Sequence, residues 1–184
     1  MTVLVVAEAV VIGLLGILVV GLLRRNAAIL REFEEGKAVT GGPGRAGTGA
    51  LARDIAGVGL NGQIVGVRVR EPDRPTLLAF MSTTCSTCNH FWRGFGDAEM
   101  LATLGSTRLI IITYGDGHER PAAIAEVAPP DVPLVMSSIA WQTYDVPSSP
   151  HFVMISEATG LITAKASAPN WDEMLQLIGL ATGA

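Results

Sequence analysis

Residues 76–88 carry the sequence TLLAFMSTTCSTC, and this stretch decides the fold. Its first part, Thr76–Met81, is an almost uninterrupted apolar run, which is typical of a fully buried strand. Three hydroxyl residues follow as a short polar loop, and then come Cys85 and Cys88, the only two cysteines among 184 residues. After Cys88 the apolar residues recur at a rough helical spacing (Phe91, Trp92, Phe95, Met100, Leu101, Leu104). The two cysteines therefore stand where a buried strand ends and a helix begins.

This junction favours thiol chemistry. Free backbone N–H groups and the positive end of the helix dipole stabilise an anion at a helix start. We therefore expect the pKa of the Cys85 thiol to be lowered and Cys85 to be the nucleophile. Cys88 lies one turn further along, close enough to attack a mixed disulfide on Cys85.

Two other interpretations of the cysteine pair fit the sequence less well. Zinc requires four ligands, and the only nitrogen donors available are His90, His118 and His151. Two buried, unreactive cysteines would need neither this spacing nor this junction. The pattern favours a dithiol redox site, which needs no metal and no organic cofactor.

Composition limits the classes of partner. The net charge is -4 and the isoelectric point is near 5.3, with no basic stretch interleaved with aromatic residues. We therefore expect no nucleic-acid binding. Charged residues make up only 16% and the mean hydropathy is +0.41, an apolar excess concentrated at the N-terminus.

The N-terminal apolar segment Val3–Leu23 predicts a transmembrane helix, because its length suffices for a hydrocarbon core of about 30 Å. A cleaved signal peptide would have positive charge before the apolar part and a small-x-small site after it. Here no Lys or Arg precedes the segment, whereas Arg24 and Arg25 follow it, so we predict an uncleaved anchor. These arginines and Arg31 favour a cytoplasmic domain by the positive-inside rule.

The same segment offers two features for contact with a partner membrane protein. Glu8 either reaches the nearby interface or makes a polar contact with another membrane helix. Ala9 and Gly13 are four residues apart, a spacing that permits close approach of helices.

We divide the chain into three parts: a transmembrane helix with its juxtamembrane extension (1–35), a Gly-rich flexible linker (36–50) and a folded domain (51–184). In the domain, Asn61–Gly62 between two strand-like runs predicts a hairpin. Further strands are expected at Arg108–Thr113, Val132–Met136, His151–Ile155 and Leu161–Lys165, and helices at Pro121–Val127, at Ser138–Tyr144 and after Asn170, which with Glu173 approaches a capping box. This alternation predicts an α/β fold with parallel strand pairs early and an antiparallel hairpin late.

These features together resemble the thioredoxin-like fold, a central mixed sheet flanked by helices. The matching pieces are the strand Leu77–Met81, the cysteine pair opening a helix, Tyr144–Val146 followed by Ser149-Pro150, and the final hairpin and helix. The anchored TlpA-like and MauD-like proteins, the latter of the methylamine-utilisation accessory type, look most similar. They too have one N-terminal membrane helix, a linker and a first hairpin.

The resemblance implies a membrane-tethered thiol–disulfide oxidoreductase that exchanges disulfides with protein substrates. Cys85 and Cys88 would be the catalytic pair. Pro150 would be a cis-proline facing them, and Ser149 and Pro150 would hold an extended substrate segment through backbone groups. Anchored members work mostly in oxidising compartments, which favours an extracytoplasmic domain, against the arginines.

Two alternatives stay open, because fold does not prove activity. One is a non-enzymatic thioredoxin-like assembly factor or subunit of a membrane complex. The other is a metallochaperone using both cysteines and a histidine. The sequence also departs from many thioredoxins, with Thr84 in place of a tryptophan and Ala79 in place of a buried acid that helps to deprotonate the second cysteine. The base for Cys88 is thus unassigned: His90, His151 or water could serve, and a surface or packing role is the simpler interpretation of each histidine.

Overall fold

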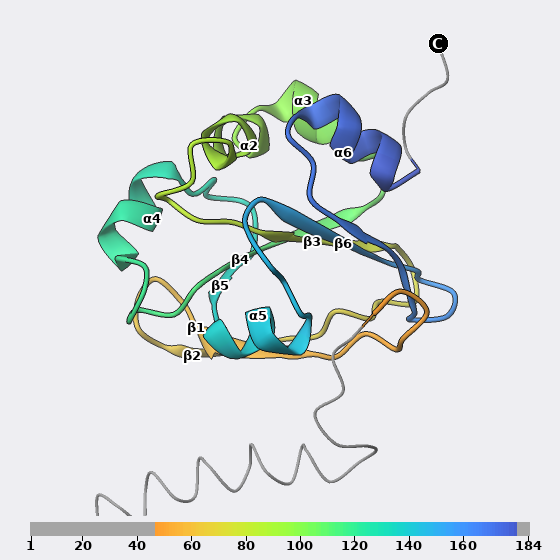
Figure 1. The fold of residues 1–184 in the computed structure, drawn as a ribbon, viewed down its shortest axis with the longest axis horizontal. Coiled ribbons are helices and arrows are strands. Elements are labelled where there is room, and N and C mark those ends of the chain that lie inside the picture. Colours follow the sequence, from red (N-terminus) through yellow and green to blue (C-terminus); the bar gives the residue numbers. More distant parts are fainter. Residues whose placement is uncertain (1–46, 180–184) are drawn as a thin grey trace, which may run out of the picture. The chain divides into compact units, whose positions relative to one another are not determined.

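A seven-stranded mixed sheet organises residues 47–179, the part of the chain that the computed structural model describes (Figure 1). Its strands are β1 (Ile55–Val58), β2 (Ile64–Val67), β3 (Thr76–Phe80), β4 (Arg108–Thr113), β5 (Leu134–Met136), β6 (His151–Ile155) and β7 (Ile162–Ala166), in the order β2-β1-β5-β4-β3-β6-β7. The helices are α2 (Cys88–Phe95), α3 (Ala98–Ala102), α4 (Pro121–Val127), α5 (Ser138–Thr143) and α6 (Trp171–Leu177). These positions confirm the predicted α/β alternation.

Strand β3 lies near the middle of the sheet and is buried along its whole length. It pairs in parallel with β4, from Thr76 opposite Arg108 to Phe80 opposite Ile112. On its other edge it pairs antiparallel with β6. The pairs β4–β5 and β6–β7 are parallel and antiparallel respectively, as the sequence predicted.

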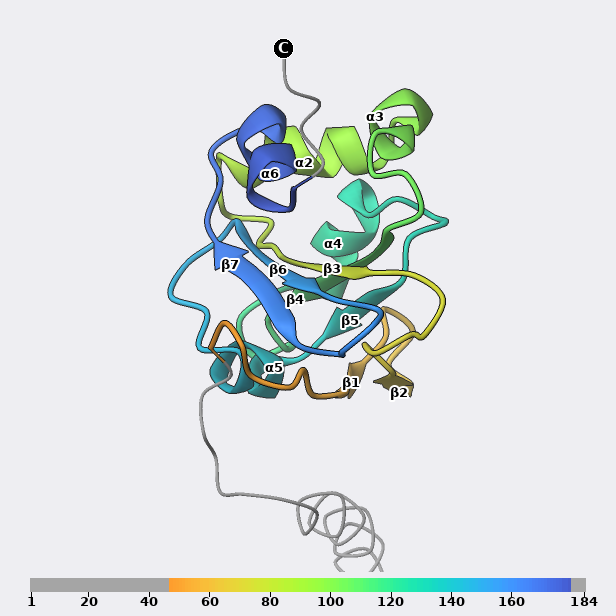
Figure 2. The same ribbon diagram turned by 90° about the vertical axis from the view of Figure 1, so that its right-hand side faces the viewer.

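Helices cover both faces of the sheet (Figure 2). Because side chains alternate along a strand, Leu77 and Ala79 of β3 face the cluster formed with α2, α4 and α6, whereas Leu78 and Phe80 face α5 and the β1–β2 hairpin. Aromatic rings fill both layers: Phe91 contacts Phe152 on one side, with ring centroids 4.9 Å apart. The core is therefore split into two layers by the sheet itself.

The apolar spacing after Cys88 runs through two helices, with a break between them. Helix α2 ends at Phe95, and the side chain of Asp97 then caps α3 by accepting hydrogen bonds from the N–H groups of Glu99 (2.8 Å) and Met100 (3.2 Å). An aspartate at this position competes with a continuing helix and starts a new one.

The predicted hairpin and the predicted N-cap at Asn170 are both present. Gly62 adopts a φ of 77°, a left-handed conformation that suits glycine at the turn between β1 and β2. At α6, Asn170 accepts a hydrogen bond from the Glu173 N–H (3.0 Å), and the Asn170 side chain donates to the Glu173 carboxylate (3.0 Å).

Within residues 47–179, no helix combines the length and apolar character that crossing a membrane requires. The predicted span Val3–Leu23 and most of the predicted linker lie outside the described residues, so those assignments stay predictions.

A buried tyrosine ties the end of α5 to the segment that enters the sheet. The Tyr144 side chain has no exposed surface. Its hydroxyl donates to the Arg53 carbonyl oxygen (2.6 Å) and accepts from the Arg53 N–H (3.1 Å). Burial raises the pKa of Tyr144 above its ordinary value, so the hydroxyl stays protonated.

His151, the first residue of β6, is buried as well. Its Nδ1 lies 3.1 Å from the Ser167 hydroxyl oxygen. Burial lowers the pKa of His151 to about 4, and the positive charge of Lys165 adds to the effect.

The substitution Tyr144→Phe is expected to lower the free energy of unfolding by about 1–2 kcal/mol, because the N–H and the carbonyl oxygen of Arg53 both lose their partner. The test is the urea midpoint of the variant relative to the wild-type chain. An unchanged midpoint would show that water replaces the hydroxyl without cost.

The folded state should lose stability between about pH 6.5 and about pH 4 through His151. In this window the unfolded chain protonates the imidazole and the folded chain does not, so the free energy of unfolding falls as the pH falls. The contribution is fully present above about pH 6.5 and amounts to about 3 kcal/mol at most. Urea unfolding of the wild-type chain and of His151→Gln across this range measures it, and the variant should have the shallower pH dependence. Parallel curves would contradict the assignment.

Candidate active site

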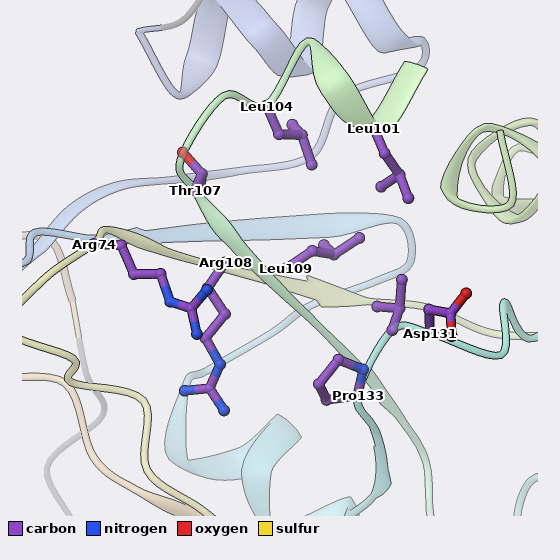
Figure 3. A pocket seen from close by; sticks show the side chains of 9 residues that line it. Arg74, Leu101, Leu104, Thr107, Arg108, Leu109, Asp131 and Pro133 are labelled. Carbon is purple, nitrogen blue, oxygen red and sulfur yellow. The ribbon is translucent and has the colours of Figure 1, made fainter. Parts of the chain in front are cut away.

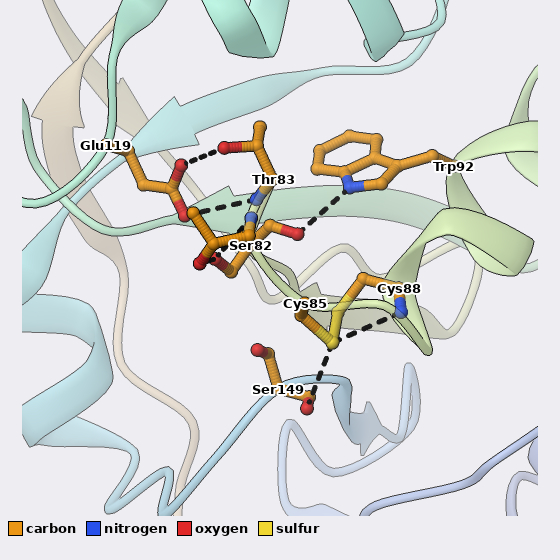
Figure 4. Close-up of a disulfide and its surroundings, with 8 residues drawn as sticks. Ser82, Thr83, Cys85, Cys88, Trp92, Glu119 and Ser149 are labelled. Atoms are coloured by element: carbon orange, nitrogen blue, oxygen red, sulfur yellow. Dashed lines mark hydrogen bonds between the residues drawn. A yellow bond between two sulfur atoms is a disulfide. The ribbon is translucent and has the colours of Figure 1, made fainter.

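Cys85 and Cys88 lie between the end of β3 and the start of α2, joined by a disulfide with Cα atoms 5.2 Å apart (Figure 4). The Cys88 N–H points back to the first cysteine, 3.1 Å from its carbonyl oxygen and 3.2 Å from its Sγ. The two side chains differ in access, because Cys85 is half-buried and Cys88 has no exposed surface. The junction expected from the sequence is therefore present, with one sulfur accessible.

The predicted substrate-binding segment, Ser149–Pro150, lies next to Cys85. The Ser149–Pro150 peptide bond is cis, as the resemblance to the thioredoxin-like fold implied. The Ser149 carbonyl oxygen lies 3.3 Å from the Cys85 Sγ (Figure 4). In the disulfide this sulfur carries no proton, so the contact is a close approach, whereas in the reduced protein a Cys85 thiol can donate a hydrogen bond to this carbonyl.

The loop before Cys85 is held by three separate contacts. The Trp92 indole of α2 donates to the Ser82 carbonyl oxygen (3.3 Å). The Glu119 carboxylate accepts from the backbone N–H (3.1 Å) and the hydroxyl (2.5 Å) of Thr83. The hydroxyl oxygens of Ser82 and Thr84 lie 3.0 Å apart. These contacts fix the path of the chain into Cys85.

Sequence reasoning missed Glu119, although a signal for it exists. It follows β4, and β3 and β4 are parallel neighbours. The loops after the carboxyl ends of parallel neighbours meet at one edge of a sheet, so a polar residue after β4 belongs with the loop after β3.

No acid stands beneath Cys88 at the position where many thioredoxins have one. Ala79 belongs to the same apolar cluster as Cys88. His151 alternates with Phe152, which is in that cluster, and so its side chain belongs to the opposite face of the sheet. His90 is exposed on α2, with its ring against Phe91. The side chain of His151 and Cys88 are therefore assigned to opposite faces of the sheet, which argues against His151 as the base for Cys88.

The described residues contain no group of three or more His, Cys, Asp or Glu side chains that could hold a metal ion.

A separate hollow of about 370 Å³ lies at the other end of the sheet (Figure 3). Its lining includes three leucines and three charged residues: Leu101, Leu104, Leu109, Arg74, Arg108 and Asp131. Arg108 is already engaged, since its guanidinium donates to the Arg68 carbonyl oxygen (2.8 Å) and to the Glu71 carboxylate (3.1 Å). Because Arg108 begins β4 and Cys85 follows the other end of its parallel neighbour, the hollow is not part of the dithiol site.

Comparison with known proteins rests on structure. A scan against protein-family models finds no match, and a search of curated proteins finds none either. Among solved structures, the chain is similar to a proposed thiol:disulfide interchange protein DsbE from Chlorobium tepidum, with a TM-score of 0.59, 16% identity, and coverage of 75% of this chain and 99% of that one.

Two further structures agree. The thioredoxin domain of a thiol-disulfide oxidoreductase from Bacteroides vulgatus has a TM-score of 0.52 and 19% identity, with 72% of this chain and 98% of that chain covered. A secreted Mycobacterium tuberculosis disulfide oxidoreductase, homologous to E. coli DsbE, has a TM-score of 0.54 and 16% identity, with 68% and 94% covered. At these identities the likeness concerns the fold, and the described residues have the thioredoxin-like fold.

Proposed function

We propose that this chain is a membrane-tethered thiol–disulfide oxidoreductase that exchanges disulfides with protein substrates through Cys85 and Cys88. The observation that carries the proposal is the unequal access of the two sulfurs. Cys85 is half-buried at the rim of the site, and Cys88 has no exposed surface. A protein substrate can therefore reach only the first cysteine, which is the division of labour that a dithiol mechanism needs.

In the reducing direction, the Cys85 thiolate attacks one sulfur of the substrate disulfide. The Cys85–substrate bond forms, and the other substrate sulfur leaves as a thiolate and takes up a proton. Cys88 then gives up its proton and attacks the Cys85 Sγ, which releases the second substrate thiol. Two electrons have moved from the dithiol to the substrate, and Cys85 and Cys88 end in the disulfide. The oxidising direction is the same sequence in reverse.

The start of α2 supplies the electrostatic support for the first step. The Cys88 N–H lies 3.2 Å from the Cys85 Sγ and can donate to a thiolate there. The Ser149 carbonyl oxygen approaches the same sulfur from the other side, at 3.3 Å. A carbonyl accepts from a thiol but repels a thiolate, so ionised Cys85 is expected to turn toward the helix start.

Substrate binding is proposed at Ser149 and Pro150. This segment leads directly into β6 and carries its backbone beside the reactive sulfur. An extended substrate chain can pair with such a backbone and present its cysteine to Cys85. The neighbouring solved structures described as thiol:disulfide interchange proteins and oxidoreductases support this class of substrate.

The tether is proposed to be the apolar segment Val3–Leu23, with the domain on the extracytoplasmic side. Solved structures of similar fold include a secreted disulfide oxidoreductase and an exposed lipoprotein thioredoxin, which supports that side. The arginines after the segment oppose it by the positive-inside rule. Protein thiols and disulfides at the membrane surface, together with any partner that contacts Glu8, would be its clients.

Cys88→Ser is expected to trap mixed disulfides with substrates, because attack on Cys85 proceeds and resolution does not. Cys85→Ser should trap none, and both variants should lose insulin disulfide reduction. The measurement is non-reducing electrophoresis of the full chain after exposure to oxidised client protein. Faster alkylation of Cys88 than of Cys85 in the reduced wild-type chain would reverse the roles. A wild-type chain that neither reduces nor oxidises a protein disulfide would favour the assembly-factor alternative.

A reporter fused after Ala184 should give alkaline phosphatase activity, since that enzyme matures only outside the cytoplasm. A fluorescent protein that folds only in the cytoplasm is the matched second reporter. Fluorescence without phosphatase activity would place the domain in the cytoplasm and would move its clients there.

A further inference from the structure

One buried charge near the dithiol has no part in the exchange steps. Glu119 is 2% exposed, and among residues 47–179 it is the only acidic side chain that is buried. It lies in the loop between β4 and α4, two residues before the start of that helix. Burial of a carboxylate is costly unless its oxygens are well hydrogen-bonded, so this position requires partners.

Both partners come from one residue. Thr83 donates its backbone N–H to one carboxylate oxygen (3.1 Å) and its hydroxyl to the other (2.5 Å) (Figure 4). Within the described residues, Glu119 has no ion pair with an arginine or lysine. Among the described residues, the Glu119 carboxylate therefore has hydrogen bonds only with Thr83, one to its backbone N–H and one to its hydroxyl.

The backbone of Glu119 is held as well. The Glu119 N–H donates to the Gly115 carbonyl oxygen (3.1 Å). The Gly115 N–H in turn donates to the hydroxyl of Ser138, the first residue of α5 (3.0 Å). A continuous set of hydrogen bonds thus runs from α5 through the loop after β4 to the loop before Cys85.

Thr83 is two residues before Cys85, so their Cα atoms are within about 7.6 Å of each other. The Cys85 Sγ must stay near the Cys88 N–H, now 3.2 Å away, for that group to stabilise a thiolate. A loop that slips by an ångström lengthens this hydrogen bond beyond its useful range.

We propose that Glu119 is a positioning residue of the dithiol. Its two hydrogen bonds to Thr83 hold Cys85 near the start of α2, and this placement sets the reactivity of the Cys85 thiol. The inference rests on the proposed function, and it assigns to Glu119 a role in tuning the exchange beyond folding of the loop.

Three substitutions separate positioning from charge and from stability. Glu119→Ala removes both hydrogen bonds. Glu119→Gln removes the charge but keeps both, because the amide oxygen accepts from the Thr83 N–H and the amide nitrogen donates to the Thr83 hydroxyl. Thr83→Val removes only the hydroxyl contact. Tyr144→Phe is the matched control, since the hydrogen bonds that it removes go to Arg53, which is outside the loop.

The measurement is the rate of Cys85 alkylation by iodoacetamide as a function of pH. It uses the full reduced chain in detergent, and peptide mass spectrometry separates Cys85 from Cys88. Equilibration of each variant with a glutathione redox buffer gives the stability of its disulfide, and a urea midpoint gives its fold stability.

Glu119→Ala is expected to raise the pKa of the Cys85 thiol and to slow alkylation at neutral pH about tenfold, because the thiolate loses the support of the helix start. Glu119→Gln should stay within about twofold of the wild-type rate, and Thr83→Val should fall between the two. Tyr144→Phe should keep the wild-type pH profile with a lower urea midpoint.

Two results would overturn the proposal. One is a wild-type alkylation profile in Glu119→Ala, whatever its stability. The other is an equally slow alkylation of Cys85 in Glu119→Gln, which would show that the charge of Glu119, and not its two hydrogen bonds, is responsible. If Glu119→Ala fails to fold, a wild-type profile in Thr83→Val overturns it equally. Loss of the proposed function is separate, because it appears as an inactive wild-type chain in the insulin assay while the alkylation profiles are still measured.

Discussion

Strand β3 is paired on both edges and buried on both faces, and the rest of the structure depends on this constraint. Parallel pairing with β4 and antiparallel pairing with β6 fix its register over its whole length. The chain can therefore leave the sheet at only one point, directly after Phe80. The same register sets Phe80 opposite His151, so the residue before β6 arrives beside the chain that leaves β3. Proximity of Cys85 and the Ser149 carbonyl oxygen follows from strand pairing before any contact between the two is considered.

The loop between β3 and α2 is a short polar segment that is held in place by side-chain hydrogen bonds. Two of its hydroxyl residues are held from other elements, Ser82 by Trp92 of α2 and Thr83 by Glu119 after β4. The third, Thr84, is held from within the loop by the hydroxyl of Ser82. Each contact uses a different donor or acceptor, so none can substitute for another. A nucleophile gains precision from such support, because small errors in its placement weaken every interaction that stabilises its charge.

Much of the architecture could be predicted because it is encoded locally. The apolar run of β3, the Asn-Gly hairpin and the N-cap at Asn170 each act within a few residues, and each prediction is confirmed. The break at Asp97 was also local, but the apolar spacing continues across it and masked the cap. The hydrogen bonds between Glu119 and Thr83 join residues 36 positions apart, and they form only once β3 and β4 are aligned. A short stretch of sequence therefore does not reveal them. The predicted membrane helix lies outside residues 47–179 and stays a prediction.

The segment that enters the domain, residues 49–52, determines where a pulling force on the chain would first act. Gly49 and Ala50 exchange backbone hydrogen bonds with Ile162, and Ala52 donates to the Gly160 carbonyl oxygen, so this segment lies antiparallel beside the start of β7. A force on the chain before Gly49 would meet these hydrogen bonds first. The load enters at the β7 edge of the sheet, two strands away from β3. Such a force would therefore act on this edge of the sheet before it reached β3, the strand that leads into the cysteine pair.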